Sequence, residues 1–185
     1  MPSPIAHLSI GYVIYRVFRR RIPADFRRLF NVSLALIVIM LLSVIPDFDF
    51  FAGLAYGDIG KYHNNLTHSL FVGVFIAFFV AGLIYWRYRA HFWLWFTISL
   101  IAYNLHPILD LFVGERGVML FWPFTEARFL APIQLFYGVQ WGLGWISPWH
   151  LVTIISELFF FLVVFFIVYL LEKKFSASSP SAPDE

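Results

Sequence analysis

The chain of 185 residues has no cysteine and few charged side chains. Without cysteine it can form no disulfide, no thiolate metal site and no cysteine nucleophile. Only 13% of the residues are charged, whereas 61% are hydrophobic and 21% are aromatic. That composition excludes an ordinary soluble domain of this size. The sequence also has no internal repeat and no basic stretch before its first apolar run, so we expect no cleavable signal peptide. These absences indicate an integral membrane protein without thiol chemistry.

Long apolar runs take up most of the chain, including "LFVGVFIAFFVAGLIYW" and "LVTIISELFFFLVVFFIVYLL". A helix needs roughly 20 apolar residues to cross about 30 Å of hydrocarbon. The pattern therefore predicts an all-α fold, a polytopic membrane bundle of about five helices, at residues 3–18, 29–45, 67–86, 91–113 and 150–171. Residues 1–175 form one membrane-embedded domain in this interpretation, and residues 176–185, "SASSPSAPDE", form a disordered polar tail.

Basic residues are distributed unevenly between the predicted loops. One side of the membrane receives ten of the thirteen: Arg16, Arg19, Arg20, Arg21, Arg27, Arg28, Arg87, Arg89, Lys173 and Lys174. The other side receives only Lys61, Arg116 and Arg128. The positive-inside rule makes the first side cytoplasmic. With five spans, the N-terminus is then predicted outside and the C-terminus inside, in a bacterial cytoplasmic membrane.

Histidines and aspartates gather at the outer ends of the predicted helices. Each of five separate segments contributes to this layer, which contains His7, Asp47, Asp49, His63, His68, His106, Asp110 and His150. Among the six histidines only His91 falls on the inner side. Ionisable groups within spans cost about 2.5 to 3.5 kcal/mol each on insertion scales and usually face a functional interior. We therefore interpret the layer as a site.

The spacing of these residues favours metal binding. In "HPILD", His106 and Asp110 stand four residues apart, so they share one helical face and can hold one ion. In "HNNLTHS", Thr67 is predicted to cap the third helix and to present His68 in its first turn. In "PDFD", an extended exit segment would point Asp47 and Asp49 to opposite sides. Asp47 is then the expected ligand. Asp49 is left as a solvated carboxylate, a residue that orients a histidine, or a ligand.

Pro107 lies next to His106 and is expected to kink the fourth helix or to end it early. Imidazole and carboxylate are the common ligands of zinc when thiolates are absent, and the same set suits manganese or iron.

The order "MPSPIAH", "PDFD", "H…THS", "HPILD" and "GVMLFWPF" resembles the bacterial membrane-bound metal-dependent hydrolases of the YdjM/YbcI-like type, over about residues 1–124. The resemblance implies a hydrolase with the metal ligands His7, Asp47, His68, His106 and Asp110. A more distant resemblance, to the zinc-dependent phospholipase C and nuclease fold, implies an all-helical core, one to three zinc ions and a phosphoester substrate.

Two departures limit these resemblances. The family's arginine and glycine after the histidine matched to His63 are replaced by Asn64 and Asn65. The late H-x-x-x-E of the phospholipases is missing, although His150 and Glu157 could substitute for it. A third ion is therefore in doubt.

A metal site of this kind activates water, and Asp49 or His63 could accept the proton. The loop at 114–149 would cover the site with aromatic residues that anchor it at the headgroups or touch substrate: Phe121, Trp122, Phe124, Trp141, Trp145 and Trp149. Arg116 and Arg128 are either surface charges or contacts for an anionic headgroup. A site at headgroup depth favours a lipid or lipid-linked phosphoester over a soluble substrate, and we expect no nucleic-acid partner.

Two other functional classes remain open at this stage: a metal-binding membrane protein without hydrolysis, and a transporter or scaffold. A transporter should place polar groups near the midplane, whereas residues 70–86 contain no charged side chain. A scaffold would leave the layer of histidines and aspartates unexplained.

Overall fold

The structure is a computed structural model, and it describes residues 2–23, 28–29, 32–57, 63–113, 116–139 and 147–177. The predicted tail at 176–185 falls outside these ranges from residue 178 onward, as do Lys61, Trp141 and Trp145. The main helices are α1 (Pro4–Phe18), α2 (Leu34–Leu42), α3 (Asp49–Ala55), α5 (Leu70–Tyr88), α6 (Phe92–Asp110) and α7 (Pro148–Ala177). Two short 3-10 helices, η1 (Ile45–Phe48) and η2 (Leu66–His68), precede α3 and α5.

The predicted all-α membrane bundle is confirmed. The described strands are two residues each, β1 (Arg28–Leu29) and β2 (Val32–Ser33), paired antiparallel with Arg28 opposite Ser33. Among the described residues, α5, α6 and α7 are long and apolar enough to cross a membrane, and the bent pair 34–42 and 45–55 makes a fourth candidate. About five helices were expected, of which the first, at residues 3–18, was short. Helix α1, with 15 residues, reaches only about 22 Å at 1.5 Å per residue.

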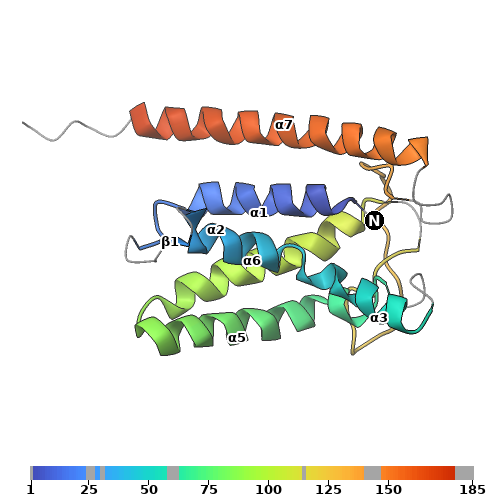
Figure 1. The fold of residues 1–185 in the computed structure, drawn as a ribbon, viewed down its shortest axis with the longest axis horizontal. Helices are drawn as coiled ribbons and strands as arrows, with labels where there is room; N and C mark the ends of the chain where they lie inside the picture. Colours follow the sequence, from blue (N-terminus) through green and yellow to red (C-terminus); the bar gives the residue numbers. More distant parts are fainter. Residues whose placement is uncertain are drawn as a thin grey trace, which may run out of the picture.

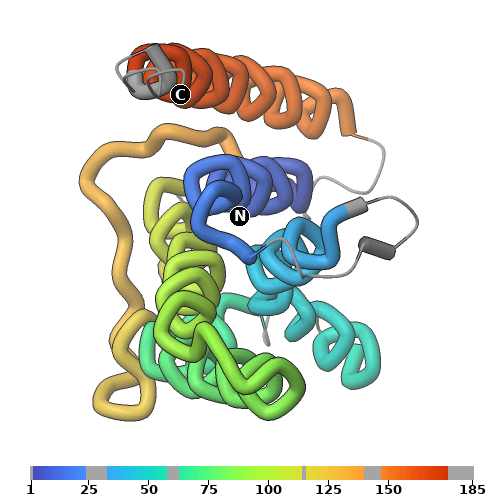
Figure 2. The backbone as a smooth tube through the Cα atoms, turned by 90° about the vertical axis from the view of Figure 1, so that its left-hand side faces the viewer, coloured from blue at the N-terminus to red at the C-terminus, as the bar shows by residue number. Residues whose placement is uncertain are grey.

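Helices α5 and α6 form a hairpin, and α1 lies between this part of the bundle and α7 (Figures 1 and 2). Helix α1 packs on α2, α6 and α7, and α2 packs on α6. Small residues at the buried interfaces let these backbones approach closely, as is usual in membranes; they include Ala6, Ala35, Ala77, Ala81 and Ala102. Larger side chains of the core, such as Trp95, Ile98 and Ile39, fill the space between them.

The bundle presents apolar side chains outward from its long helices. On α5 and α7, large exposed residues include Phe75, Phe79, Phe159, Leu162 and Phe166. Because a soluble protein would bury such residues while a bilayer solvates them, these faces are suited to lipid.

The second predicted helix differs most from the structure. It begins at Leu34 instead of residue 29, and it bends by 60° between its two parts. The predicted extended segment at Asp47 and Asp49 is wrong, because Asp47 lies in η1 and Asp49 begins α3. Both carboxylates are buried instead of reaching water.

Two predictions about helix ends are also wrong. Thr67 does not cap the third helix, since α5 starts at Leu70 and the Ser69 hydroxyl accepts a hydrogen bond from the N–H of Phe71. His68 therefore lies in η2 and not in the first turn of α5. Helix α6 runs through Pro107 and ends at Asp110, short of the expected residue 113.

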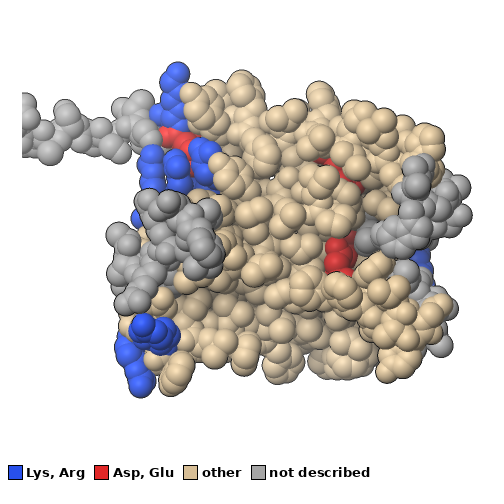
Figure 3. Space-filling model, in the orientation of Figure 1, with Lys and Arg blue, Asp and Glu red and all other residues tan. Residues whose placement is uncertain are grey.

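Charged residues mark one end of the bundle. Arg16 and Arg19, at the end of α1, both pair with Glu172 near the end of α7, at 2.5 and 3.1 Å. On the face drawn in Figure 3, Lys and Arg gather mainly at this end. His7 lies near the start of α1 and Asp110 at the end of α6, so the predicted site lies at the other end.

The segment 116–139 crosses the end of the bundle that holds the site. The N–H of Leu70 donates to the carbonyl of Leu120, and the N–H of Met119 donates to the carbonyl of Asn64. The Ser69 hydroxyl donates to the carbonyl of Trp122. These bonds fix the segment against η2, and the aromatic side chains of Phe121 and Phe124 remain exposed.

Candidate metal centre

The structure brings the predicted ligands together from four different elements. His7 comes from α1, Asp47 from η1, His68 from η2, and His106 with Asp110 from α6. His63, in the turn before η2, completes the cluster. All six side chains are buried. We call these six residues the His/Asp cluster.

The His/Asp cluster contains two groups of three residues, each close enough to share an ion. The first is His7, His106 and Asp110, and the second is Asp47, His63 and His68. Within each group the potential ligand atoms lie within 4.8 Å of one another. The groups also touch, because His106 Nε2 is 3.3 Å from Asp47 Oδ1 and His68 Nε2 is 3.2 Å from Asp110 Oδ2. The two groups of potential ligand atoms therefore adjoin one another.

Two histidine rings are held so that the same nitrogen faces the centre. His106 Nδ1 lies 2.7 Å from the carbonyl of Ser43, which can only accept, so this nitrogen carries the proton. The Nε2 atom of His106 then carries the lone pair. It lies 3.2 Å from Nε2 of His68. Two imidazole nitrogens that face one another need a cation or a proton between them.

Asp49 orients the other side of the cluster. Its Oδ1 accepts from His63 Nδ1 at 2.8 Å, and its Oδ2 accepts from the N–H of Asn64 and the hydroxyl of Thr67 at 3.1 and 2.9 Å. The same oxygen is 3.3 Å from His68 Nδ1. Of the three roles considered for Asp49, the geometry matches a carboxylate that orients histidines. A carboxylate on Nδ1 fixes the tautomer and leaves Nε2 for a metal.

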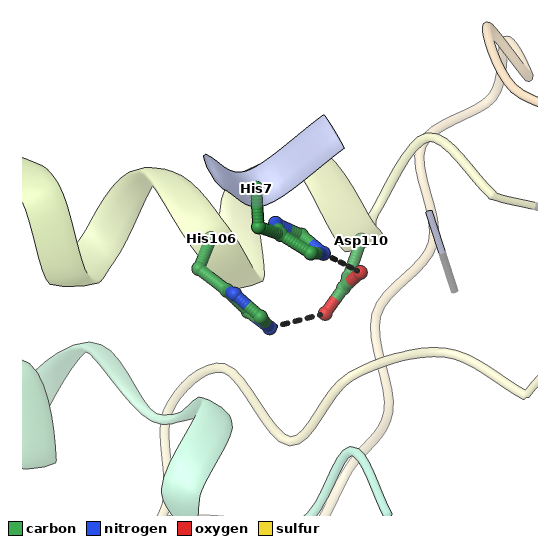
Figure 4. A group of neighbouring side chains, drawn as sticks. All are labelled: His7, His106 and Asp110. Carbon is green, nitrogen blue, oxygen red and sulfur yellow. Dashed lines mark ion pairs between the residues drawn. The ribbon is translucent and has the colours of Figure 1, made fainter. Parts of the chain in front are cut away.

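The N-terminal histidine reaches the cluster by stacking. The rings of His7 and His106 lie 3.6 Å apart and 18° from parallel. His7 Nε2 points at Asp110 Oδ1 at 3.6 Å, while His106 points at the other oxygen of the same carboxylate, 3.4 Å away (Figure 4). Asp110 therefore faces both rings of its group, as the four-residue spacing from His106 predicted.

Most of the polar atoms that face the centre have no hydrogen-bond partner among the described residues. They are Nε2 of His7, Nε2 of His63, and all carboxylate oxygens of Asp47 and Asp110. Buried polar atoms are normally satisfied, and leaving one unpaired costs about 1–3 kcal/mol. These unpaired atoms lie close together and are all potential ligands, so the cluster could hold a cation.

The carboxylates also act on the charge of His68. Burial alone would lower the pKa of this imidazole, but the neighbouring carboxylates of Asp110, Asp47 and Asp49 outweigh it and raise the pKa well above its ordinary value. A cation that binds at Nε2 would therefore displace a proton. The carboxylates of the cluster would therefore stabilise positive charge, whether it is carried by a proton or by a metal cation.

Glu157 and His150 do not join either group of potential ligands in the described chain. Glu157 instead accepts from the N–H and the hydroxyl of Ser3, at 2.9 and 2.5 Å, and so holds the start of α1 against α7. His150 lies partly buried in the first turn of α7. His91 is exposed at the start of α6, far along that helix from His106, as expected.

Arg128 lies beside the two asparagines that replace the family's arginine and glycine. It donates to the carbonyls of Gly117 and Asn64, at 3.0 and 3.4 Å, and to the side chain of Asn65. Burial and the nearby Arg116 lower the pKa of Arg128. The residue therefore fixes the turn after His63, a role that the sequence did not reveal.

Sequence reasoning also missed the groups that hold the ligands in place. The carbonyl of Ser43 orients His106, and the Tyr103 hydroxyl donates to the carbonyl of Thr67 at 2.6 Å. A backbone carbonyl carries no sequence signal. The tyrosine, however, is three residues before His106 and on the same helical face, which could have suggested a role.

Comparison with known proteins places these residues in context. The family model described as "YdjM inner membrane protein" matches residues 1–177. The protein "Inner membrane protein YbcI" of Escherichia coli (strain K12) is 35% identical over 133 residues, which cover 64% of this chain and 71% of that protein. No solved structure matches the chain.

Proposed function

The chain belongs to the YdjM inner membrane protein family, and we propose that it is a metal-dependent hydrolase that cleaves a phosphoester in a lipid or lipid-linked substrate. As a multi-pass inner membrane protein it has the lipid bilayer as its surroundings. The observation that carries the proposal is the His/Asp cluster, in which unpaired nitrogens and carboxylate oxygens converge in a buried place.

The ligand types support zinc, with manganese or iron as alternatives. Three imidazoles and two carboxylates, or four and two if His63 takes part, match the nitrogen and oxygen ligands of these metals in the absence of thiolates. The two groups of ligands correspond to one or two ions. A third ion has no support from Glu157, which is occupied with Ser3.

A divalent cation at such a site lowers the pKa of a bound water and stabilises charge on a phosphoryl oxygen. The residues of the chain supply the charge, the orientation and the burial that this chemistry requires. Asp47 and Asp110 provide negative charge, and Asp49 holds His63 and His68 in one tautomer. Burial keeps bulk water away from all of them.

His63 is the better candidate for the proton acceptor of the two predicted ones. Both oxygens of Asp49 already accept hydrogen bonds, whereas Nε2 of His63 has no hydrogen-bond partner among the described residues and lies 3.8 Å from Asp47 Oδ1. The Asp49 carboxylate on Nδ1 would stabilise the imidazolium that forms when Nε2 takes a proton. His63 could alternatively complete the second ligand group. Substituting His63 by Ala separates these roles, since loss of a proton acceptor lowers turnover with metal retained and loss of a ligand removes metal.

The lipid substrate is proposed from the position of the cluster. The cluster lies at the end of the bundle away from most of the basic residues. The positive-inside rule assigns this end to the outer face of the membrane. Ester and phosphoester bonds of lipids lie at the depth where membrane helices end. A transporter is less well supported, because α5 carries no charged residue between Leu70 and Trp86.

The test is to reconstitute the purified protein in mixed bilayers with zinc or manganese and to follow phospholipids and prenyl phosphates by mass spectrometry. The wild type should bind at least one divalent ion per chain and release a product. Asp110→Ala should lose both properties, while His91→Ala, altered at the opposite end, should keep them. If the wild type binds metal but cleaves no lipid, the result supports a metal-binding membrane protein without hydrolysis. Turnover that persists in Asp110→Ala would defeat the proposal.

A further inference from the structure

A cavity of about 430 Å³ lies next to the His/Asp cluster, between η1 and α3 on one side and η2, α5 and α6 on the other. This volume is within the usual range for small-molecule sites. Most of its wall is hydrocarbon, from Ile45, Phe48, Ala52, Leu66, Val72 and Ile76.

The polar part of the wall adjoins the metal centre. Asp49 and Thr67 line the cavity, and both belong to the hydrogen-bond network that orients His63 and His68. Tyr103 lines it as well and fixes Thr67 from α6. A molecule in the cavity therefore has one part among apolar side chains and another part beside the cluster.

Several residues that line the cavity or lie next to it are exposed and apolar. Phe48 and Leu66, both in the lining, are 53% and 49% exposed. On α5, Val72 and Ile76 line the cavity while their neighbour Phe75 is 73% exposed on a helix that is long and apolar enough to span the membrane. The cavity thus adjoins a face of α5 that is suited to lipid.

The charge of the wall excludes an anionic headgroup as the occupant. Among the described residues that line the cavity there is one carboxylate, Asp49, and no basic side chain. Within the apolar part of the cavity a phosphate would lose its hydration and find no basic side chain, whereas a hydrocarbon chain matches the apolar wall.

We propose that this cavity binds a hydrocarbon chain of a membrane lipid, acyl or prenyl, and leaves the linkage of its headgroup at the Asp49 end, beside the His/Asp cluster. That the chain belongs to the substrate rests on the proposed hydrolase function. Binding of the chain itself requires only the cavity.

The experiment uses lipids that carry a photoreactive diazirine near the end of the chain, with two arms: phosphatidylglycerol with a labelled acyl chain, and a labelled prenyl phosphate. The full-length protein is irradiated in bilayers, and labelled peptides are mapped by mass spectrometry. We expect labelling of Ala52, Leu66, Val72 and Ile76 in at least one arm, and the arm that labels more strongly identifies the source of the chain.

Two matched variants on α5 test the site. Val72→Trp fills the cavity and should reduce its labelling at least fivefold, while Phe75→Trp, on the exposed face, should leave it unchanged. Metal content of both variants should equal that of the wild type, which shows that the fold is retained. Labelling of the exposed face alone, or labelling of the cavity that Val72→Trp does not reduce, would overturn the inference.

Asp110→Ala separates this inference from the proposed function, because it should lose metal and keep cavity labelling. Lipid turnover without cavity labelling would defeat the chain site alone. Cavity labelling without turnover in the wild type would defeat the hydrolase alone.

Discussion

At the scale of single residues, one carboxylate that is not itself in either ligand group organises much of the centre. Asp49 contacts two histidines, a backbone N–H and a hydroxyl from the same stretch of chain, residues 63–68. It therefore ties the turn before α5 to the start of α3. The metal affinity of the cluster should depend on it as strongly as on a ligand.

We predict that Asp49→Asn lowers metal affinity about 10- to 100-fold, the usual effect of losing an orienting carboxylate. The amide offers one acceptor oxygen where the carboxylate offers two, so His63 and Thr67 cannot both be satisfied. Competition with a chelating dye measures the affinity. Glu126→Gln, which alters an exposed carboxylate of the segment 116–139, serves as the control. Equal affinities for Asp49→Asn and the wild type would show that the rings keep their orientation without it.

The sequence predicted which residues gather but not how Asp49 acts. His7, His68, His106 and Asp110 could be placed in one layer because each adjoins the end of a long apolar run. The directions of Asp47 and Asp49 depend on whether the exit segment is extended or helical, and "IPDFDF" carries no clear period. The 3-10 turn at η1 replaces the expected extended segment and buries both side chains, with Asp47 in a ligand group as predicted and Asp49 beside the histidines.

At the scale of elements, α1 is held by two contacts that position His7. One is with α2, where Gly11 lies so close that a Cβ atom would be 2.9 Å from the Cα of Met40 and 2.6 Å from the Ser43 hydroxyl. The other is with α7, through Ser3 and Glu157. Helix α1 has no side-chain cap of its own, so Glu157 also places negative charge at its positive end.

Gly11→Ala should destabilise the bundle by about 1–3 kcal/mol, the typical cost of overpacking. The neighbouring atom is backbone and cannot swing aside. Thermal unfolding in detergent measures the effect. Gly82→Ala is the matched control, because a Cβ at that helical position meets nothing within 4 Å; it should be neutral or slightly stabilising. If Gly11→Ala unfolds at the same temperature as Gly82→Ala, the close packing of α1 on α2 is contradicted.

Glu157→Gln should lower metal affinity, although Glu157 is not a ligand. Both carboxylate oxygens accept from Ser3, and a glutamine can accept with only one, so the first turn of α1 and His7 within it should loosen. We expect a loss of several-fold, smaller than for His7→Ala. Glu172→Gln, at the other end of the same helix, should change the pairing with Arg16 and leave metal affinity unaltered. If both variants bind equally well, the contact with Ser3 does not position His7.

Long helices were predictable because a run of apolar residues admits few alternatives in a membrane. The α5–α6 hairpin and α7 match the predicted spans to within a few residues at most ends. The bend between α2 and α3 was not predictable, since Pro46 fits both the end of a helix and the first turn of a new one. The contact of Ser3 with Glu157 joins residues at opposite ends of the chain, and no local pattern reports it.

At the scale of the whole molecule, the bundle is polarised along its length. On the face drawn in Figure 3, Lys and Arg gather mainly at one end, where Arg16 and Arg19 pair with Glu172, and the His/Asp cluster lies toward the other end. Acidic residues contribute little to membrane orientation, so the carboxylates of the cluster do not oppose the positive-inside rule. Orientation in the membrane therefore follows from the arginines and lysines of the opposite end.

This polarity predicts the side of the membrane on which the site acts. A reporter fused after Lys174 should read cytoplasmic, because the end of α7 lies with Arg16 and Arg19. A reporter inserted after Gly57, just beyond α3, should read extracytoplasmic, because α3 begins at Asp49 beside the cluster. Each fusion must retain metal binding, which shows that the bundle is intact. If both reporters read the same side, the two ends of the bundle do not face opposite compartments, and a site at the outer headgroups is excluded.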